Sequence, residues 1–146
     1  MLRRSSLIFA LLLALGMLPA YAFTGNTIHT MIPFPFIVAG KTLPAGRYEL
    51  VQVDPRQDNQ WLIRNLGDDS KEAIFDAEQE NAFEPKLDTY VAFEEIHQRH
   101  YLSDIWTAGT VDGWHVPVEA ESSLASSVKP KMHKVEATTL RSEPSK

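Results

Sequence analysis

The sequence predicts an all-β protein, folded as an antiparallel β-sandwich or flattened barrel of six to seven short strands. Short segments of alternating apolar and polar residues recur along the chain, with turn-forming residues about every 8 to 12 positions. The chain contains no cysteine, so the domain must be held together by an apolar core rather than by disulfide bonds. Large aromatic side chains in the expected strands can supply that core: Phe34, Phe36, Tyr48, Trp61, Phe75, Phe93, Tyr101 and Trp106.

The first 22 residues have the features of a cleaved signal peptide. Arg3 and Arg4 form a basic start, residues 7–18 are an apolar run, and Ala20-Tyr21-Ala22 places small residues at the two positions read by signal peptidase. The run is too short to span a membrane well, and no cysteine follows it that could carry a lipid anchor. The sequence therefore predicts an exported protein, periplasmic or secreted, with no stable membrane span after cleavage.

Beyond the signal peptide, residues 23–127 are expected to form a single β-sandwich domain and residues 128–146 a disordered basic tail. The expected domain holds seven basic and 17 acidic residues, whereas the tail holds five basic and two acidic residues. Phosphate contacts need clustered lysine and arginine, so the charge pattern argues against nucleic acid as a partner. Two prolines and few large apolar residues favour disorder in the tail.

The first expected strand spans residues 27–38 and carries two prolines. Pro33 and Pro35 lack a backbone N–H, so one side of this strand loses two successive hydrogen-bond donors. Such a strand suits the outer edge of a sheet, where pairing with a strand of another chain must be prevented. A turn at residues 43–46 follows, and further strands are expected at residues 47–53, 60–65 and 71–77, with a loop over residues 78–86.

The strongest hairpin signal lies at residues 89–106. A two-residue turn at His97-Gln98 would place Phe93 opposite Leu102, Tyr90 opposite Ile105 and Glu95 opposite His100. Tight turns favour asparagine, aspartate or glycine, so a longer loop or a bulge at this turn is the alternative. After the hairpin, residues 114–118 are expected to form a last short strand, or Pro117 opens a short C-terminal helix running to about residue 128.

Two sequence motifs occur in a defined order along the domain. The first runs from Ile32-Pro33-Phe34 to Thr42-Leu43-Pro44-Ala45-Gly46-Arg47-Tyr48, and the second is Tyr101-Leu102-Ser103 followed by Ile105-Trp106-Thr107. Together they resemble a family of small secreted bacterial β-rich proteins of unknown function. The resemblance implies export, one β-rich domain and no assigned activity. His97-Gln98 stands where members of that family usually have Gly-Asp, so the resemblance gives no role to this histidine.

The densest group of metal-ligand residues also lies on this hairpin. Glu95 and His100 are expected side by side on one face, and His97 at the tip could supply a third ligand, whereas Asp104 lies further along. A metal site needs three or four ligands that converge on one point. The competing interpretation is a simple exposed Glu–His pair. We expect no cofactor beyond this candidate.

Other candidate residues lie near the end of the domain. Trp114, with His115 beside it, is the best candidate for an exposed ring that binds a glycan or apolar ligand, whereas Trp61 and Trp106 are expected in the core. Ser103 lacks the glycine-flanked turn of a nucleophilic serine. The sequence therefore favours a non-enzymatic binding domain whose partner is a protein or glycan of the cell envelope. The alternatives are a metal-dependent or hydrolytic enzyme using the His97/His100 region and a structural subunit of an envelope assembly.

Overall fold

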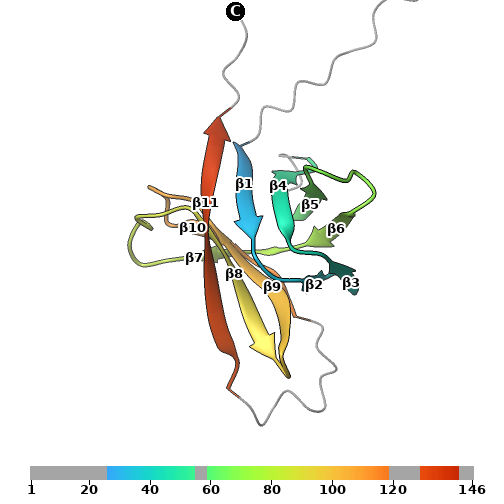
Figure 1. The fold of residues 1–146 in the computed structure, drawn as a ribbon. Helices are drawn as coiled ribbons and strands as arrows, with labels where there is room; N and C mark the ends of the chain where they lie inside the picture. The colour runs from blue at the N-terminus through green and yellow to red at the C-terminus, as the bar shows by residue number, and fades with distance from the viewer. Residues whose placement is uncertain (1–25, 55–58, 119–128, 142–146) are drawn as a thin grey trace, which may run out of the picture.

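The computed structural model describes residues 26–54, 59–118 and 129–141, and these residues form β-strands and no helix (Figure 1). The all-β prediction is therefore confirmed, although the strands number eleven rather than six or seven. They are β1 (Asn26–Ile32), β2 (Phe36–Val38), β3 (Lys41–Leu43), β4 (Gly46–Gln52), β5 (Gln60–Asn65), β6 (Glu72–Asp76), β7 (Glu78–Asn81), β8 (Tyr90–Ile96), β9 (Arg99–Trp106), β10 (Asp112–His115) and β11 (Lys131–Arg141).

The strands form one continuous sheet that curves into a nearly closed barrel. Its order is β3-β2-β9-β8-β11-β1-β4-β5-β6, with β10 paired to both β7 and β9 beside this path. All pairs are antiparallel except β2 with β9, which run parallel. The two ends of the path meet where Lys41 Nζ donates a 2.9 Å hydrogen bond to the backbone carbonyl of Glu72. This curvature confirms the flattened-barrel prediction, with one parallel pair added.

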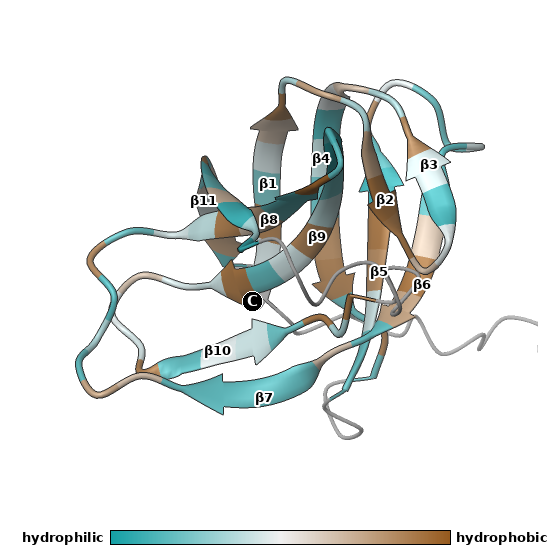
Figure 2. Cartoon of the chain, turned by 90° about the horizontal axis from the view of Figure 1, so that it is seen from below, coloured by the Kyte–Doolittle hydropathy of each residue, from teal (hydrophilic) through white to brown (hydrophobic). Residues whose placement is uncertain are grey.

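The core fills the inside of the barrel with alternate residues of the strands. In β5, for example, Trp61, Ile63 and Asn65 are buried while the residues between them are more exposed. Figure 2 shows hydrophobic residues on β2 and on part of β9, whereas β7 is hydrophilic. The large side chains that are almost fully buried come from strands on all sides: Tyr48, Phe36, Phe93, Ile28, Ile32, Leu50, Ile63, Leu102, Ile105 and Val91.

The predicted tight turn between β8 and β9 is confirmed. His97 and Gln98 both have positive φ, 50° and 64°, which is the pattern of a type I′ turn. Phe93 pairs with Leu102, and Ile96 pairs with Arg99, as the two-residue turn requires. Residues that disfavour a left-handed backbone nevertheless occupy the turn, because the right-handed twist of the two long strands selects this geometry.

Further from the turn, a bulge shifts the hairpin register by one residue. The pairing changes between Ala92 and Phe93, and Ser103 is the extra residue on β9. Tyr90 therefore lies opposite Trp106, and the predicted pairing of Tyr90 with Ile105 is wrong. Because the side-chain direction alternates along a strand, the extra residue lets both Leu102 and Ile105 face the core.

The predicted edge strand at residues 27–38 is wrong. β1 ends at Ile32 and lies inside the sheet, paired with β4 on one side and β11 on the other. Pro33 and Pro35 fall in the break between β1 and β2, where missing N–H groups interrupt the pairing. Their effect is to end a strand and to send the chain across the barrel to β9, rather than to protect a sheet edge.

The prediction of a disordered tail is wrong for β11. This strand pairs with β1 through residues 137–141 and with β8 through residues 131–136. Alternate residues of β11 are half-buried, and Val135 and Ala137 pack against the core. Modest side chains suffice here because one half of the strand is hydrogen-bonded to β1 and the other half to β8. Residues 119–128, which include most of the predicted helix, lie outside the described residues. No helix in the described part of the chain could cross a membrane.

Candidate metal site

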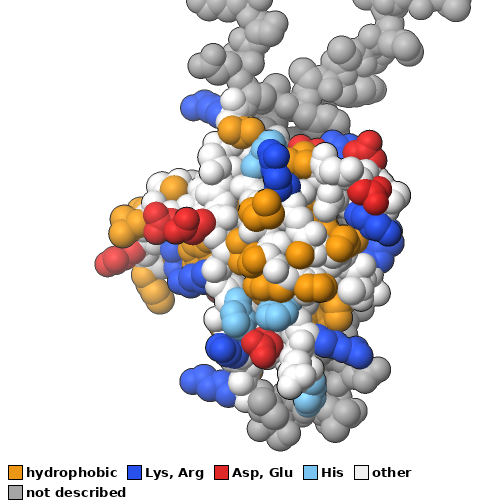
Figure 3. Space-filling view, in the orientation of Figure 1, with side chains coloured by type: hydrophobic (Ala, Val, Ile, Leu, Met, Phe, Trp, Pro, Cys, Tyr) orange, Lys and Arg blue, Asp and Glu red, His pale blue; other side chains and the backbone are white. Residues whose placement is uncertain are grey.

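Three strands bring two histidines and one carboxylate together at the hairpin end of the barrel. Glu95 of β8 lies opposite His100 of β9, and His133 of the adjacent β11 lies opposite Phe93. Since Glu95 and Phe93 share a face of β8, all three polar side chains point to the core side of the sheet, at its mouth. Figure 3 shows histidine side chains around a carboxylate, below an apolar area of this face.

The ligand atoms of this cluster converge on one another. Glu95 Oε2 is 2.6 Å from His133 Nε2 and 3.8 Å from His100 Nε2. One ligand atom from each residue lies within 4.8 Å of the other two. The three side chains retain 20 to 29% of their exposure, so an ion from solution can reach them.

An aromatic floor holds the two imidazole rings. Phe34, in the break between β1 and β2, stacks on His100 with ring centroids 3.9 Å apart and an interplanar angle of 18°. The same ring meets Phe93 edge-on at 5.1 Å. The imidazoles of His100 and His133 lie 5.1 Å apart at 72° to each other. Stacking on Phe34, which itself packs against buried Phe93, therefore limits the rotation of the His100 ring.

The electrostatics of Glu95 and His100 favour the protonation states of metal ligands, whereas His133 would have to release the proton that it donates from Nε2 to Glu95. The hydrogen bond from His133 lowers the pKa of Glu95 and outweighs the opposing effect of burial. Burial lowers the pKa of His100, and the charge of His133 adds to this effect against the attraction of Glu95. Near neutral pH the carboxylate is ionised and the His100 imidazole is neutral, which are the forms that bind metal.

The geometry fits a tetrahedral ion after a small adjustment. Ligand distances of about 2.1 Å place the ligand atoms of such an ion about 3.4 Å from one another. The separation of 3.8 Å between Glu95 and His100 is close to that value. The hydrogen bond between Glu95 and His133 would have to lengthen by about 0.8 Å, which a small side-chain rotation provides.

The structure brings together two of the three predicted ligands and replaces the third. Glu95 and His100 lie side by side, as expected from the hairpin register. His97 is exposed at the tip of the turn and does not join them. Its place is taken by His133, which sequence reasoning missed because it lies in the segment expected to be disordered. The alternation of residues along β11 was the signal that could have revealed it.

A second polar group surrounds Asp104 on the far side of the bulge. Asp104 Oδ1 lies 3.0 Å from His115 Nδ1, and its Oδ2 accepts a 2.7 Å hydrogen bond from the hydroxyl of Ser103. Burial alone would lower the pKa of His115, but the hydrogen bond and charge of Asp104, together with the charges of Glu80 and Glu94, outweigh it and raise that pKa. Ser103 is fully buried and bonded to the carboxylate rather than to the imidazole. This arrangement cannot act as a Ser-His-Asp triad, in which the imidazole must contact the hydroxyl.

The sequence predicts that Trp114 is an exposed ring for ligand binding, but its ring is not exposed in this way. Trp114 is half-buried, packs against the core, and meets Trp61 edge-on with centroids 5.7 Å apart. Trp61 and Trp106 are buried, as predicted. The other member of the predicted ligand-binding pair, His115, is partly exposed, and its Nδ1 is engaged by Asp104.

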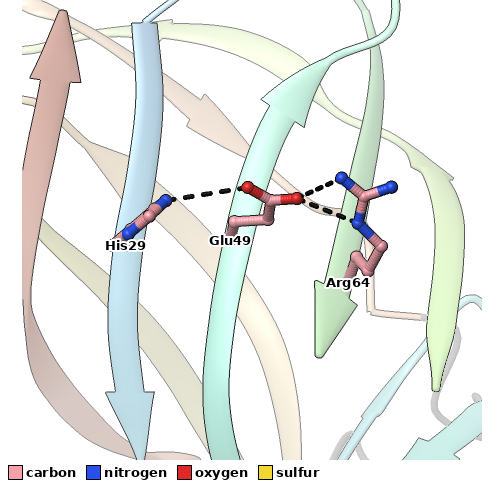
Figure 4. A network of polar contacts seen from close by, with 3 residues as sticks. All are labelled: His29, Glu49 and Arg64. Atoms are coloured by element: carbon pink, nitrogen blue, oxygen red, sulfur yellow. Dashed lines mark hydrogen bonds and ion pairs between the residues drawn. The ribbon is translucent and has the colours of Figure 1, made fainter. Parts of the chain in front are cut away.

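A third polar network lies on the outside of the barrel. Glu49 of β4 accepts hydrogen bonds from the guanidinium of Arg64 on β5 and lies 3.6 Å from His29 on β1 (Figure 4). The three residues are directly opposite one another across adjacent strands. The contact with Glu49 raises the pKa of Arg64. Charged pairs of this kind stabilise the pairing of neighbouring strands, so a role in stabilising the sheet accounts for this network.

Comparison with known proteins gives no relative from which a function could be transferred. No protein-family model, curated protein or solved structure matches the chain. The function is therefore inferred from the side chains and their geometry.

Proposed function

We propose that this chain is an exported, non-enzymatic binding domain that binds one divalent transition-metal ion through Glu95, His100 and His133. The observation that carries the proposal is the convergence of three ligand atoms, from three neighbouring strands, within 4.8 Å of one another. Export is supported by the signal-peptide features of residues 1–22 and by the resemblance to small secreted bacterial β-rich proteins.

The donor set favours zinc or copper over magnesium or calcium. Two imidazole nitrogens and one carboxylate oxygen suit Zn²⁺ and Cu²⁺, whereas Mg²⁺ and Ca²⁺ prefer oxygen ligands alone. Three protein ligands leave one coordination position of a tetrahedral ion open. Because the cluster lies at the mouth of the barrel, that position faces solvent and is available to water or to a donor from a partner.

The competing explanation is that the cluster only ties β11 to the hairpin. A bonded Glu95–His133 pair would stabilise the pairing of β11 with β8 without any ion. The two explanations differ in one respect: only a metal site needs His100, which lies 3.8 Å from the carboxylate and makes no close hydrogen bond to it. His100 is therefore the residue that separates them.

Titration calorimetry of the mature chain, residues 23–146, with ZnCl₂ and with CuSO₄ tests the proposal. We expect one equivalent of metal to bind, and His100→Ala and His133→Ala each to weaken binding by about 100-fold or more. His97→Ala is the matched control, since this histidine lies on the same hairpin but outside the cluster. Unchanged affinity in His100→Ala, or equal losses in His97→Ala, would refute the site.

Electron paramagnetic resonance of the Cu²⁺-loaded, unaltered chain gives an answer that does not depend on the folding of the variants. We expect coupling to two imidazole nitrogens. Coupling to none or to one would overturn the assignment.

N-terminal sequencing of the protein recovered from the exported fraction tests export separately, with Phe23 expected as the first residue.

A further inference from the structure

The barrel is not fully closed, and its two end strands, β3 and β6, each have one strand partner in the described part of the chain. Among the described strands, β6 pairs only with β5. The carbonyl of Lys71 and the N–H of Ala77 both bond toward β5, so the odd-numbered residues of this segment use their backbone groups there. Because backbone direction alternates along a strand, Ile74 and Asp76 direct their N–H and C=O groups away from β5, into the gap.

The gap is lined on its inner side by apolar residues. We call it the seam; it is bounded by β6 on one side and by residues 37–40 and 116–118 on the other. It forms a hollow of about 320 Å³, with Phe75, Leu102 and Val116 among its lining residues. At one end Lys41 crosses the gap to Glu72. Figure 2 shows β3 and β6, the two ends of the sheet, near each other in the barrel wall.

The outer rim of the seam is acidic around one exposed apolar side chain. Ile74 is 56% exposed on the outside of the barrel. Glu72 and Asp76, two residues before and after it on the same face of β6, are also exposed. The side chains of a strand added to β6 would therefore alternate between this acidic outer rim and the apolar inner lining.

We propose that the seam binds an extended peptide segment of a partner protein, added as a strand beside β6, with basic residues alternating with apolar ones. Backbone hydrogen bonds to Ile74 and Asp76 hold the segment, in the manner of other strand-addition complexes. Its basic side chains face Glu72 and Asp76 on the outer rim, and its apolar side chains enter the hollow beside Phe75. This surface is independent of the metal cluster.

The same charges disfavour a second copy of this chain as the occupant. In an antiparallel pair of β6 strands centred on Ile74, Glu72 of each copy would lie opposite Asp76 of the other, and like charges directly opposite are destabilising. The net charge of −5 for the whole chain adds to that repulsion. A basic segment removes both penalties.

Fluorescence anisotropy with a labelled peptide of alternating lysine and valine tests the proposal, with a peptide of alternating glutamate and valine as the matched control. We expect the lysine peptide alone to bind the mature chain. Asp76→Lys should weaken binding by about fivefold or more, because it replaces an attraction by a repulsion near the surface. Glu78→Lys, an equal charge change on β7, should have less effect, since Glu78 lies outside the seam.

Ile74→Pro tests the backbone contact itself. Its N–H points away from β5, so proline there removes a donor from the seam and leaves the β5–β6 ladder intact. We expect loss of peptide binding with retained thermal unfolding. Equal binding of both peptides, or unchanged affinity in both Asp76→Lys and Ile74→Pro, would overturn the proposal. A dimer in light scattering that Ile74→Pro dissociates would assign the seam to a second copy instead, and would equally overturn it.

Discussion

Gly113 of β10 is the position where a single added carbon atom should be most informative about the fold. It pairs with Trp106 of β9, and its Cα lies against the indole ring. A Cβ atom built at Gly113 would lie 2.5 Å from Cε3 and 2.6 Å from Cδ2 and Cζ3 of Trp106. The glycine is therefore required by close approach to a side chain rather than by its backbone conformation.

The expected cost of Gly113→Ala follows from that geometry. Carbon atoms in good contact lie about 3.5 to 4.0 Å apart, so the ring or β10 must move by about 1 Å. Trp106 is only 6% exposed, and Lys86 Nζ lies 4.5 Å above its ring, so the indole has little room to move. Overpacking of this kind costs about 1–3 kcal/mol of the free energy of unfolding.

Urea unfolding followed by tryptophan fluorescence measures this cost. Gly67→Ala is the control, because a Cβ there would lie an acceptable 3.4 Å from Asn65 Oδ1. We expect a loss of about 1–3 kcal/mol for Gly113→Ala, with a shifted emission spectrum, and a change of under about 0.5 kcal/mol for Gly67→Ala. Equal stability of the two variants would show that β10 does not lie against Trp106.

Two further predictions concern the turn of the hairpin and the His115–Asp104 pair. Replacing His97-Gln98 by Asn-Gly should raise the free energy of unfolding by about 0.5–1 kcal/mol, because both positions have positive φ; chemical denaturation measures it. The raised pKa of His115 means that its stabilising contact with Asp104 is fully present below its ordinary pKa of 6.5 and is lost as the pH rises through the raised value. An NMR titration of His115 should show that Asp104→Asn lowers this pKa; an unchanged pKa would disprove the coupling.

Local patterning was enough to predict the hairpin and two of the three residues of the candidate site. The alternation in β8 and β9 determines which residues face each other, so the pairing of Glu95 with His100 followed from the position of the turn alone. The bulge at Ser103 could not be predicted in this way. It is selected by the need to bury both Leu102 and Ile105, which depends on what packs against them.

The strands that pair with β1, and the third ligand, His133, could not be predicted from local patterns, because both depend on distant parts of the chain. Pro33 and Pro35 indicate where pairing is interrupted, but they do not show whether the interruption protects an edge or ends a strand. Likewise β11 has few large apolar residues, and its order depends on partners on both sides, β1 and β8. His133 becomes a ligand only through that long-range pairing, which propensity in a single segment cannot reveal.

The position of β11 also has a consequence for biosynthesis. This strand, the last described segment of the chain, lies between β8 and the first strand, β1. Until residue 141 has been synthesised, β8 and β1 have no complete strand between them, and the barrel cannot be completed. Such long-range closure is slow.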